Sequence, residues 1–284
     1  MRGIILINAY SPAVTRQARR MSEELEKLGA DVAIARNDFF PYSTEREISG
    51  GLDCEFCVYF DKDKYVSRMM EKSGVRLFDK ARAIELCDDK MLTHIELAGR
   101  GIPMPKTLPG LLCYDRAAKV KSSALDRIEA EIGYPVIVKQ SFGSLGKGVF
   151  KADDRAELTR IVESVKCEPH LFQRYVAQSS GKDMRVIVIG GAVVGGIIRE
   201  SDGDFRSNIG LGAHAVKTDV PNEIAELASS VATALDLDYC GIDFLLAPEP
   251  LVCEVNSNAF FDAFEQATGI NVAKAYAEHI INNV

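Results

Sequence analysis

Residues 239–258 constrain the fold more than any other stretch, because two apolar segments flank a proline-containing turn. The sequence YCGIDFLL runs into APEP and returns as LVCEVNSN, a pattern that predicts an antiparallel hairpin. Centring the turn in the middle of APEP places Asp243 opposite Glu254, and directly opposed residues project from the same face of a strand pair. Asn256, two positions further along, is predicted to point the same way.

Two carboxylates and an amide in an otherwise apolar strand pair predict a cation site. Like charges directly opposite one another destabilise a sheet unless something neutralises them. A hard divalent cation does so, and a ligand set made only of oxygen atoms suits Mg²⁺, with Mn²⁺ as an alternative ion. The competing interpretation is a solvent-facing strand face with incidental acids, which the flanking Ile242, Phe244, Val252 and Val255 disfavour.

A second candidate site follows a predicted strand, PVIVKQ, at residues 135–140. Lys139 ends the apolar run of this strand, and the next segment, SFGSLGKGVF, contains three glycines. Glycines let backbone N–H groups approach a phosphate closely, and a neighbouring lysine supplies positive charge. The pattern G-x-x-x-x-G-K-[ST] is absent, so this is not a Walker loop. The alternative is a plain hairpin turn beside a surface lysine.

Two further basic positions are candidate phosphate ligands. The loop DFRSN contains Arg206 and Asn208, and arginine suits two-pronged contact with phosphate because its planar guanidinium keeps its charge. Lys90 lies in a predicted helix, DKMLTHIELAGRG, for which Asp88 is the predicted N-cap. The alternatives are a solvated loop for the arginine and a solvent-exposed helix face for Lys90.

Residues 1–84 predict a lobe of parallel α/β structure. Strands are expected at 4–7, 30–36 and 55–60, and the helix after the first strand is expected to stop at Gly29. A second helix is expected around KYVSRMMEKSG. Strands that alternate with helices through short connections favour a parallel sheet.

The rest of the chain predicts antiparallel sheets with helices on them, divided into residues 85–178 and 179–284. The first part holds two short helices, the proline-marked linker IPMPKTLPG and the strands around the glycine-rich segment. The second part holds two hairpins, and Gly190 and Gly191 are expected to form the two-residue turn of the earlier one. Helices are expected to follow each hairpin.

Composition excludes some classes of partner. The chain is 47% hydrophobic and 26% charged, with a net charge of −7, which argues against general binding to nucleic acid or to an anionic membrane. No apolar run approaches about 18 residues, and the N-terminal apolar run is too brief for a signal peptide, so we expect no membrane span and a cytoplasmic location. The seven cysteines are expected to be reduced thiols, and the C-x-x-C at Cys54 and Cys57 is interpreted as structural.

Taken together, these stretches resemble the ATP-grasp superfamily and, within it, the RimK-type α-L-glutamate ligases. The resemblance covers residues 79–284 and extends to the first lobe only by position. The stretches that carry it are, in order, DDK at 88–90, PVIVK at 135–139, the glycine-rich segment, FQRYV at 172–176, GKDMR at 181–185, DFRSN at 204–208, GID at 241–243 and EVN at 254–256. The resemblance implies an α/β (α+β) ATP-grasp fold, in which an N-terminal parallel α/β lobe precedes two antiparallel α+β lobes that clasp ATP.

The resemblance also implies roles for individual residues. Arg206 and Lys139 would act in catalysis, and the glycine-rich segment would close over the phosphates as a flap. The backbone of Arg174–Val176 would meet adenine, and Asp183 would hold the ribose side of the nucleotide. The implied nucleotide-binding residues are Lys90, Lys139, Ser144, Gly146, Gly148, Gln173, Arg174, Tyr175, Val176, Asp183, Arg206, Ser207 and Asn208. The implied ligands of one or two magnesium ions are Asp243, Glu254 and Asn256.

The implied reaction is the ATP-dependent joining of a carboxylate to an amine through an acyl phosphate. The implied partners are an amino acid, with glutamate favoured as the amine, and a carboxylate acceptor that is a peptide, a protein tail or a cofactor. Homo-oligomers are common among such ligases, so a homo-oligomer is expected, with no nucleic-acid or membrane partner. The alternatives are a kinase that stops at phosphoryl transfer on the same fold and a non-catalytic nucleotide-binding protein.

The segment after EVN departs from the family pattern. Members that modify ribosomal proteins have a turn of small residues with a proline there, whereas this chain reads EVNSNAFFDAF. This stretch is expected to border the acceptor site. Phe260 and Phe261 therefore indicate a pocket that differs from one for a ribosomal protein tail.

Overall fold

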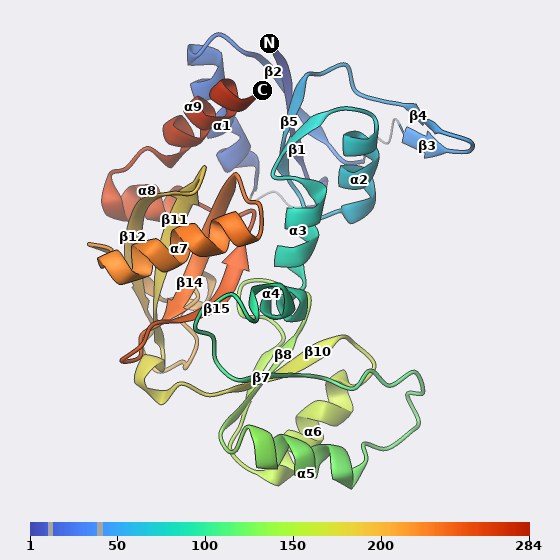
Figure 1. Ribbon diagram of the computed structural model, residues 1–284, viewed down its shortest axis with the longest axis vertical. Helices are drawn as coiled ribbons and strands as arrows, with labels where there is room; N and C mark the ends of the chain where they lie inside the picture. Colours follow the sequence, from blue (N-terminus) through green and yellow to red (C-terminus); the bar gives the residue numbers. More distant parts are fainter. Residues whose placement is uncertain (11–13, 39–41) are drawn as a thin grey trace.

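The computed structural model describes residues 1–10, 14–38 and 42–284. Figure 1 shows the N-terminal elements and both termini at the top, the C-terminal sheet below them on one side, and a middle lobe at the bottom. One main sheet falls within each of the predicted segments 1–84, 85–178 and 179–284. The boundaries between these segments stay predictions.

The first sheet is parallel throughout, as predicted, with the strand order β2-β1-β5-β6. Its strands are β1 (Arg2–Ile7), β2 (Asp31–Arg36), β5 (Phe56–Phe60) and β6 (Arg76–Phe78). The accompanying elements are the helices α1 (Val14–Lys27) and α2 (Lys64–Lys72) and the projecting hairpin of β3 (Tyr42–Thr44) and β4 (Ile48–Gly50). Strand β5, FCVYF, is buried at every position, because helices cover both faces of a parallel sheet.

Two short helices lead from the first sheet to the middle lobe, as the sequence predicts. They are α3 (Ala81–Asp88) and α4 (Lys90–Leu97). The predicted N-cap at Asp88 is wrong by one residue, because Asp89 caps α4 by accepting from the N–H groups of Met91 at 2.9 Å and Leu92 at 3.3 Å. Asp88 instead ends α3, and only the second of these consecutive aspartates stands immediately before the first residue of α4.

The middle sheet is antiparallel and has the order β7-β10-β8-β9. Its elements are β7 (Thr107–Pro109), β8 (Val136–Gln140), β9 (Val149–Ala152), β10 (His170–Arg174), α5 (Ser122–Glu131) and α6 (Arg155–Val165). Apolar residues of both helices pack against Val136, Val138 and Phe172 of the sheet. Strand β7 lies in the segment predicted to be only a linker, and its proline is tolerated because β7 is an edge strand.

The third sheet is antiparallel and has the order β13-β12-β11-β14-β15. Its elements are β11 (Lys182–Ile189), β12 (Ala192–Glu200), β13 (His214–Thr218), β14 (Tyr239–Leu245), β15 (Leu251–Asn256), α7 (Asn222–Ala234), α8 (Asp262–Thr268) and α9 (Val272–Asn283). The predicted turn at Gly190 and Gly191 is confirmed, with φ values of 56° and 79°, both positive as a type I′ turn requires. Strand β13 and helix α8 were not expected from the sequence.

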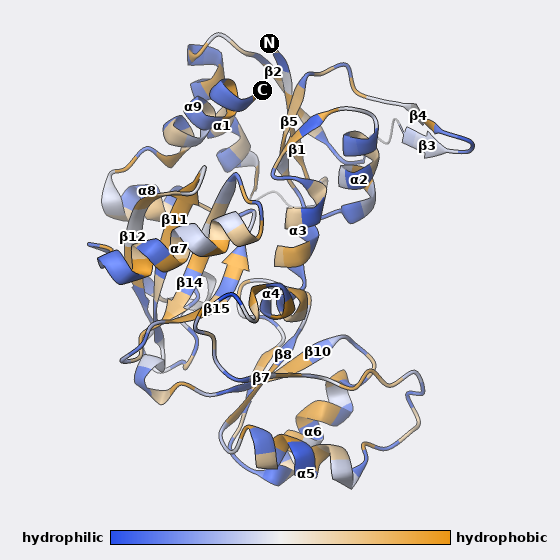
Figure 2. Cartoon of the chain, viewed as in Figure 1, coloured by the Kyte–Doolittle hydropathy of each residue, from blue (hydrophilic) through white to orange (hydrophobic). Residues whose placement is uncertain are grey.

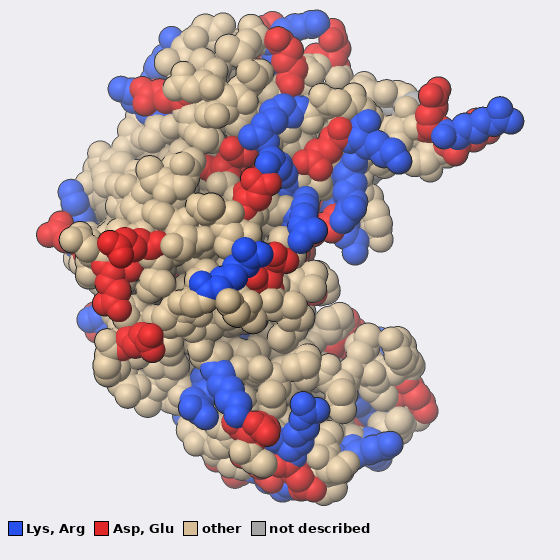
Figure 3. Space-filling view, in the orientation of Figure 1, with Lys and Arg blue, Asp and Glu red and all other residues tan. Residues whose placement is uncertain are grey.

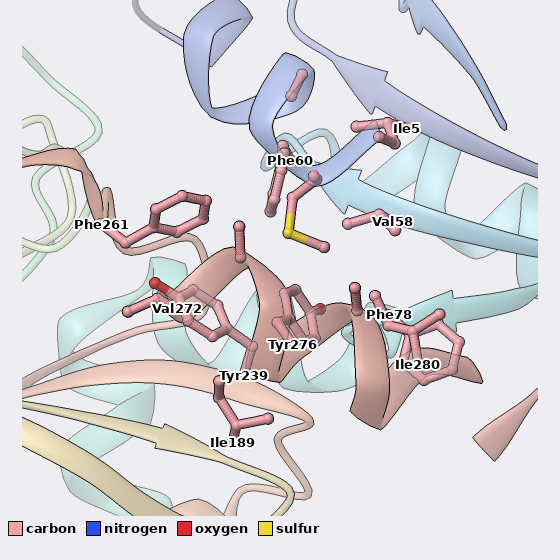
Figure 4. Close-up of a cluster of buried hydrophobic side chains, with 14 of the residues drawn as sticks. Ile5, Val58, Phe60, Phe78, Ile189, Tyr239, Phe261, Val272, Tyr276 and Ile280 are labelled. Carbon is pink, nitrogen blue, oxygen red and sulfur yellow. The ribbon is translucent and has the colours of Figure 1, made fainter. Parts of the chain in front are cut away.

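The first and third sheets share one hydrophobic core. Figure 4 shows Phe60 and Phe78 of the first sheet close to Tyr276 of α9 and Tyr239 of β14. The rings of Tyr239 and Tyr276 stack with centroids 4.8 Å apart. Figure 2 shows that hydrophobic residues concentrate in the strands and that the helices alternate between hydrophilic and hydrophobic positions. The N-terminal lobe is therefore joined to the third sheet by continuous apolar packing.

The visible surface has mixed charge, and the cysteines are free thiols. Figure 3 shows basic and acidic side chains interspersed over the visible face, with a hollow between the N-terminal elements and the middle lobe. No helix in the described part of the chain is both long and apolar enough to cross a membrane. All seven cysteines are described and are free thiols, and Cys57 is buried in β5.

Asp79 is a buried carboxyl at the junction of the first and third sheets. It is 2% exposed and accepts from the backbone N–H groups of Asp238 at 2.5 Å and Tyr239 at 3.0 Å. Its second oxygen has no hydrogen-bond partner among the described residues. Burial raises the pKa of Asp79 well above its usual range, against the opposing effect of the two N–H donors, because apolar surroundings solvate a charged carboxylate poorly.

We expect Asp79 to lower the stability of the protein as the pH rises. A carboxyl whose pKa is raised by folding favours the folded state most below its unfolded pKa, near about 4, and this contribution is lost as the pH rises through the folded pKa. Asp79→Asn removes the titration and keeps an oxygen for the two N–H groups. Between about pH 5 and pH 8 the free energy of unfolding should fall more in the wild type than in the variant, by at least about 1 kcal/mol. Urea unfolding at both pH values measures this, and equal changes in the two proteins would contradict it.

Candidate functional site

A cleft of about 800 Å³ lies between the middle sheet and the third sheet. Its walls come from the start of α4, from β8 and β9, from the segment after β10, and from β11, β12, β14 and β15 with the loop that follows β12. Its charged lining residues are Lys90, Lys139, Lys147, Arg174, Arg199 and Arg206, together with Asp183, Asp243 and Glu254. Cations outnumber carboxylates here although the whole chain has a net charge of −7, so the cleft favours an anionic ligand.

The cleft brings together all but two of the residues predicted to bind nucleotide or metal. Those that line it are Lys90, Lys139, Ser144, Gly146, Gln173, Arg174, Tyr175, Val176, Asp183, Arg206, Ser207, Asn208, Asp243 and Glu254. Gly148 does not line it. Its φ is 72°, and a Cβ there would lie 2.3 Å from Oε1 of Gln140, so this position needs glycine for backbone conformation and close packing. Asn256 lines a second cavity instead.

The hairpin of β14 and β15 has the predicted register, with Asp243 opposite Glu254. Nearer the turn the register shifts by one residue, because Phe244 pairs with Val252 and Cys253 is the extra residue of a β-bulge. A bulge re-aims the side chains beside it, and the consecutive residues Cys253 and Glu254 both line the cleft. The turn pattern alone did not predict that Cys253 would face the site.

Asp243 forms ion pairs with two arginines that the sequence patterns did not indicate. Arg185 lies directly opposite it in the ladder of β11 and β14 and donates from Nε at 2.7 Å and Nη2 at 2.8 Å. Nη2 of Arg199 lies 2.9 Å from Asp243. Burial acts to raise the pKa of Asp243, but the two guanidinium groups outweigh it and hold this pKa below its usual value. The carboxylate is therefore ionised, and both of its oxygens already have cationic partners.

Asp183, predicted to hold the ribose side of the nucleotide, also has partners within the protein for both of its oxygens. It accepts from Nε of Arg199 at 2.7 Å and from Oγ of Ser207 at 2.5 Å. Arg199 lies opposite Asp183 in the ladder of β11 and β12, but folding the hairpin evenly about its two glycines would pair Asp183 with Ile198, because a β-bulge between Ile187 and Val188 shifts the register by one residue. The pair of Arg185 and Asp243 required knowing that β14 lies beside β11, which the order along the chain does not reveal.

Lys139 is buried in the cleft wall, and no carboxylate in the described part of the chain forms an ion pair with it. It is 8% exposed, and its hydrogen-bond partner among the described residues is Sγ of Cys253 at 3.3 Å. Burial raises the pKa of the Cys253 thiol against the opposing effect of Lys139, so this partner is neutral. Burial, and after it Lys139, lowers the pKa of the nearby His94 to about 4. A buried ammonium beside neutral groups is costly, and an anion in the cleft would compensate it.

The glycine-rich segment between β8 and β9 is tied to the two other predicted phosphate ligands. Nζ of Lys90 donates to the carbonyl of Gly143 at 2.7 Å. Nη1 of Arg206 donates to the carbonyl of Gly146 at 2.9 Å, while Nη2 binds Asp204 at 2.7 Å. Backbone carbonyls thus accept hydrogen bonds from side-chain donors that could instead bind a phosphate.

Apolar side chains form another part of the cleft lining. They are Ile137, Val149, Leu245 and Phe205. The residues Arg174, Tyr175 and Val176 also line the cleft. The side-chain amide of Gln173 forms hydrogen bonds within the protein, because its Nε2 lies 3.0 Å from Oγ1 of Thr107 and 3.1 Å from Nε2 of His94. An apolar wall next to several cations suits a planar base that carries phosphates.

The fit of a magnesium ion depends on Glu254 and Asn256. Glu254 has Lys90 at 3.5 Å as its ion-pair partner among the described residues. Nδ2 of Asn256 is buried without a hydrogen-bond partner among the described residues, which calls for an acceptor there, whereas a cation would bind Oδ1 of this amide. Carboxylate and amide oxygens suit Mg²⁺. Across the described ranges no three His, Cys, Asp or Glu residues gather as a metal-binding group, and Asp243 is held by its arginines, so the two residues on β15 are the available donors.

A second cavity of about 1,340 Å³ adjoins the cleft. The residues lining both are Ser144, Arg199, Asn208 and Glu254. The N-terminal lobe contributes Asn8, Phe60, Asp61 and Lys62 to the second cavity. Of the two phenylalanines expected to border the acceptor site, Phe260 lines this cavity, but Phe261 is fully buried in the shared core. The expectation for Phe261 was wrong because this side chain packs against Tyr239.

Comparison with known proteins identifies the family. Residues 87–280 match the family described as the RimK-like ATP-grasp domain. N-acetylaspartylglutamate synthase A of Homo sapiens is 39% identical over 229 residues, covering 79% of this chain and 57% of that protein. β-Citrylglutamate synthase B of Homo sapiens is 38% identical over 226 residues, covering 78% of this chain and 57% of that protein, so the chain matches a little over half the length of each.

A solved RimK-domain ATP-grasp protein of Sphaerobacter thermophilus has a TM-score of 0.75 with this chain at 20% identity. The similarity covers 99% of this chain and 100% of that one, which shows that the two share their fold. The chain therefore belongs to the RimK-like ATP-grasp family and has the ATP-grasp fold.

Proposed function

We propose that this protein is an ATP-dependent ligase that joins a carboxylate to the amine of glutamate through an acyl phosphate. The observation that carries the proposal is the buried ammonium of Lys139, which has a neutral thiol at 3.3 Å instead of a carboxylate. A nucleotide phosphate supplies the missing negative charge. The names of the two human relatives both contain glutamate, which favours glutamate as the amine substrate.

Three cations would hold the phosphates of ATP. Lys139 is already free of carboxylates, and Lys90 and Arg206 would exchange the carbonyls of the glycine-rich segment for phosphate oxygens. That segment would then lie over the phosphates and donate backbone N–H groups to them. The adenine would lie against Ile137, Val149 and Leu245, beside the backbone of residues 174–176.

Glu254 and Asn256 would hold magnesium on β15. The ion, when bound, supplies charge neutralisation for the phosphoryl group that is transferred. Asp243 lies opposite Glu254 in the adjacent strand β14. Arg185 and Arg199 fix the carboxylate of Asp243 there. Because Arg199 also pairs with Asp183, this network has two arginines and two carboxylates, and the positive charge that would stabilise the anionic transition state comes from Lys90, Lys139 and Arg206.

The reaction would proceed in two steps. A carboxylate oxygen of the acceptor attacks the γ-phosphorus of ATP, the bond to the bridging oxygen breaks, and ADP leaves. The glutamate amine then attacks the carbonyl carbon of the acyl phosphate, the carbon–oxygen bond breaks, and phosphate leaves with its electron pair. The nitrogen, which arrives as an ammonium group, loses two of its three protons to solvent and keeps one in the amide. Lys139 and Arg206 would stabilise the charge on the transferred group, and the second cavity, which adjoins the cleft, would hold the two substrates.

Replacing one proposed metal ligand should abolish turnover without unfolding the protein. We expect Glu254→Gln to lower ADP formation by at least about 100-fold, because loss of metal binding removes several kcal/mol of transition-state stabilisation. Glu249→Gln is the matched control, since Glu249 is an exposed glutamate in the turn of the same hairpin. A coupled ADP assay with magnesium, ATP, glutamate and a carboxylate acceptor, either N-acetylaspartate or citrate, measures both variants. Full activity of Glu254→Gln would overturn the assignment of the metal site.

An isotope experiment tests the acyl phosphate. N-acetylaspartate and citrate, the acids that the names of the relatives suggest, are the first acceptors to examine with ¹⁸O in their carboxylates. One ¹⁸O atom should appear in each phosphate released, because the carboxylate oxygen that attacks phosphorus leaves with it. Mass spectrometry of the phosphate measures the transfer. Amide formation with unlabelled phosphate would exclude this intermediate, and a stable phosphorylated acceptor without free phosphate would favour a kinase.

A further inference from the structure

Three polar residues meet at the carboxyl edge of the first sheet. Asn8 follows β1, Asn37 follows β2, and Asp61 follows β5, and these three strands are neighbours with β1 in the middle. Ligands of open parallel sheets bind outside the carboxyl ends of the strands, where the strand order reverses. The chain adds β2 on one side of β1 and β5 on the other, so the reversal lies between Asn8 and Asp61.

Asp61 is held by neutral donors alone. Its Oδ1 accepts from Nδ2 of Asn8 at 3.1 Å and from its neighbour's backbone N–H, that of Lys62, at 2.7 Å. Its Oδ2 accepts from Nδ2 of Asn37 at 2.5 Å. A carboxylate offers about four acceptor sites, so one site on Oδ2 is open. Nζ of Lys62 does not neutralise Asp61, because it pairs with Asp88 at 2.8 Å.

Asp61 and Asn8 both line the second cavity, which also contains Glu254 and Asn256. The lining has three carboxylates, and two of them have cationic partners: Glu254 lies 3.5 Å from Lys90, and Asp262 lies 3.3 Å from Arg16. Asp61 is the third, is only 7% exposed, and has no ion-pair partner among the residues that the structure describes. The wall therefore presents one buried, uncompensated negative charge on the side of the N-terminal lobe.

We propose that Asp61 binds the ammonium group of the amine substrate and that Asn8 and Asn37 fix its carboxylate for this contact. This inference rests on the proposed ligase function, because it assigns the side of the second cavity that receives the amine. An ammonium group has three donors and no acceptor, so it fits an open carboxylate oxygen surrounded by neutral donors. A metal ion fits poorly, since the amide N–H groups occupy the oxygens that it would need.

The electrostatics of the ligand-free cavity agree with this assignment. Burial raises the pKa of Asp61, against the hydrogen bonds that favour its charged form. The neutral donors therefore do not fully replace the solvation that the carboxylate loses on burial. An incoming ammonium group would supply the opposite charge, and binding would depend on that charge more than on the shape of the amine.

Binding of L-glutamate and 2-hydroxyglutarate tests the inference, since the two ligands share both carboxylates and differ by ammonium against hydroxyl. Isothermal titration calorimetry would use the full chain with magnesium and a non-hydrolysable ATP analogue. The wild type should bind glutamate at least about 10-fold more tightly than the hydroxy acid, as expected for a hydrogen bond between charged groups. Asp61→Asn should weaken glutamate binding by about 10-fold or more and leave the hydroxy acid unchanged.

Asp63→Asn is the matched control. Asp63 lies two residues away and caps α2 through the N–H groups of Tyr65 and Val66, so this variant should keep the preference for glutamate. Loss of the preference in Asp61→Asn alone would support the inference. Full preference in Asp61→Asn would overturn it, and so would equal affinity of the wild type for the two ligands, a comparison that requires no variant to fold.

Phosphate release by the wild type separates this inference from the proposed function. An ammonium preference that depends on Asp61, without phosphate release from any acceptor, would contradict the ligase and leave the binding site supported. Phosphate release with glutamate, but with no preference over the hydroxy acid, would overturn the role of Asp61 and leave the ligase standing.

Discussion

The buried ammonium of Lys139 is the interaction on which the cleft depends. This lysine ends an apolar strand of the middle sheet and reaches Sγ of Cys253 in the third sheet. The thiol is neutral, so the contact joins two lobes without neutralising the charge. Lys90 and Arg206 are satisfied by carbonyls of the glycine-rich segment. The ligand-free protein therefore holds three cations ready, and an anion between the lobes would bind all of them.

An ionic network forms part of the wall of this cleft. Arg185, Asp243, Arg199 and Asp183 alternate in charge across β14, β11 and β12, and each arginine lies opposite its carboxylate in the strand ladder. Buried charges of this kind are tolerated only when they are paired and hydrogen-bonded. Glu254 and Asn256, on the edge strand β15, are outside this network. The charged groups of the network bind one another, whereas Glu254 and Asn256 keep oxygen atoms that a metal ion could bind.

Local patterns predicted most of the elements and the register of the last hairpin, because turn position and strand alternation are short-range properties. The same patterns missed the three-residue strands β3, β4, β6 and β7, the strand β13 and the helix α8, and they placed an N-cap on Asp88 instead of Asp89. Family motifs predicted nearly the whole cleft lining. The pairing of Arg185 with Asp243 and the meeting of Asn8, Asn37 and Asp61 depend on the order of strands in a sheet. Such long-range order is not contained in any one segment of the sequence.

Unfolding of Lys139→Met with and without nucleotide tests the central claim most directly. In the wild type, magnesium–ATP at about 100 times its Kd should add about 2.7 kcal/mol to the free energy of unfolding. The variant replaces the buried charge by an apolar chain of similar length. It should be more stable than the wild type without ligand, by about 1 kcal/mol or more, and should gain little from magnesium–ATP. A variant that is less stable without ligand, yet fully stabilised by magnesium–ATP, would contradict the account.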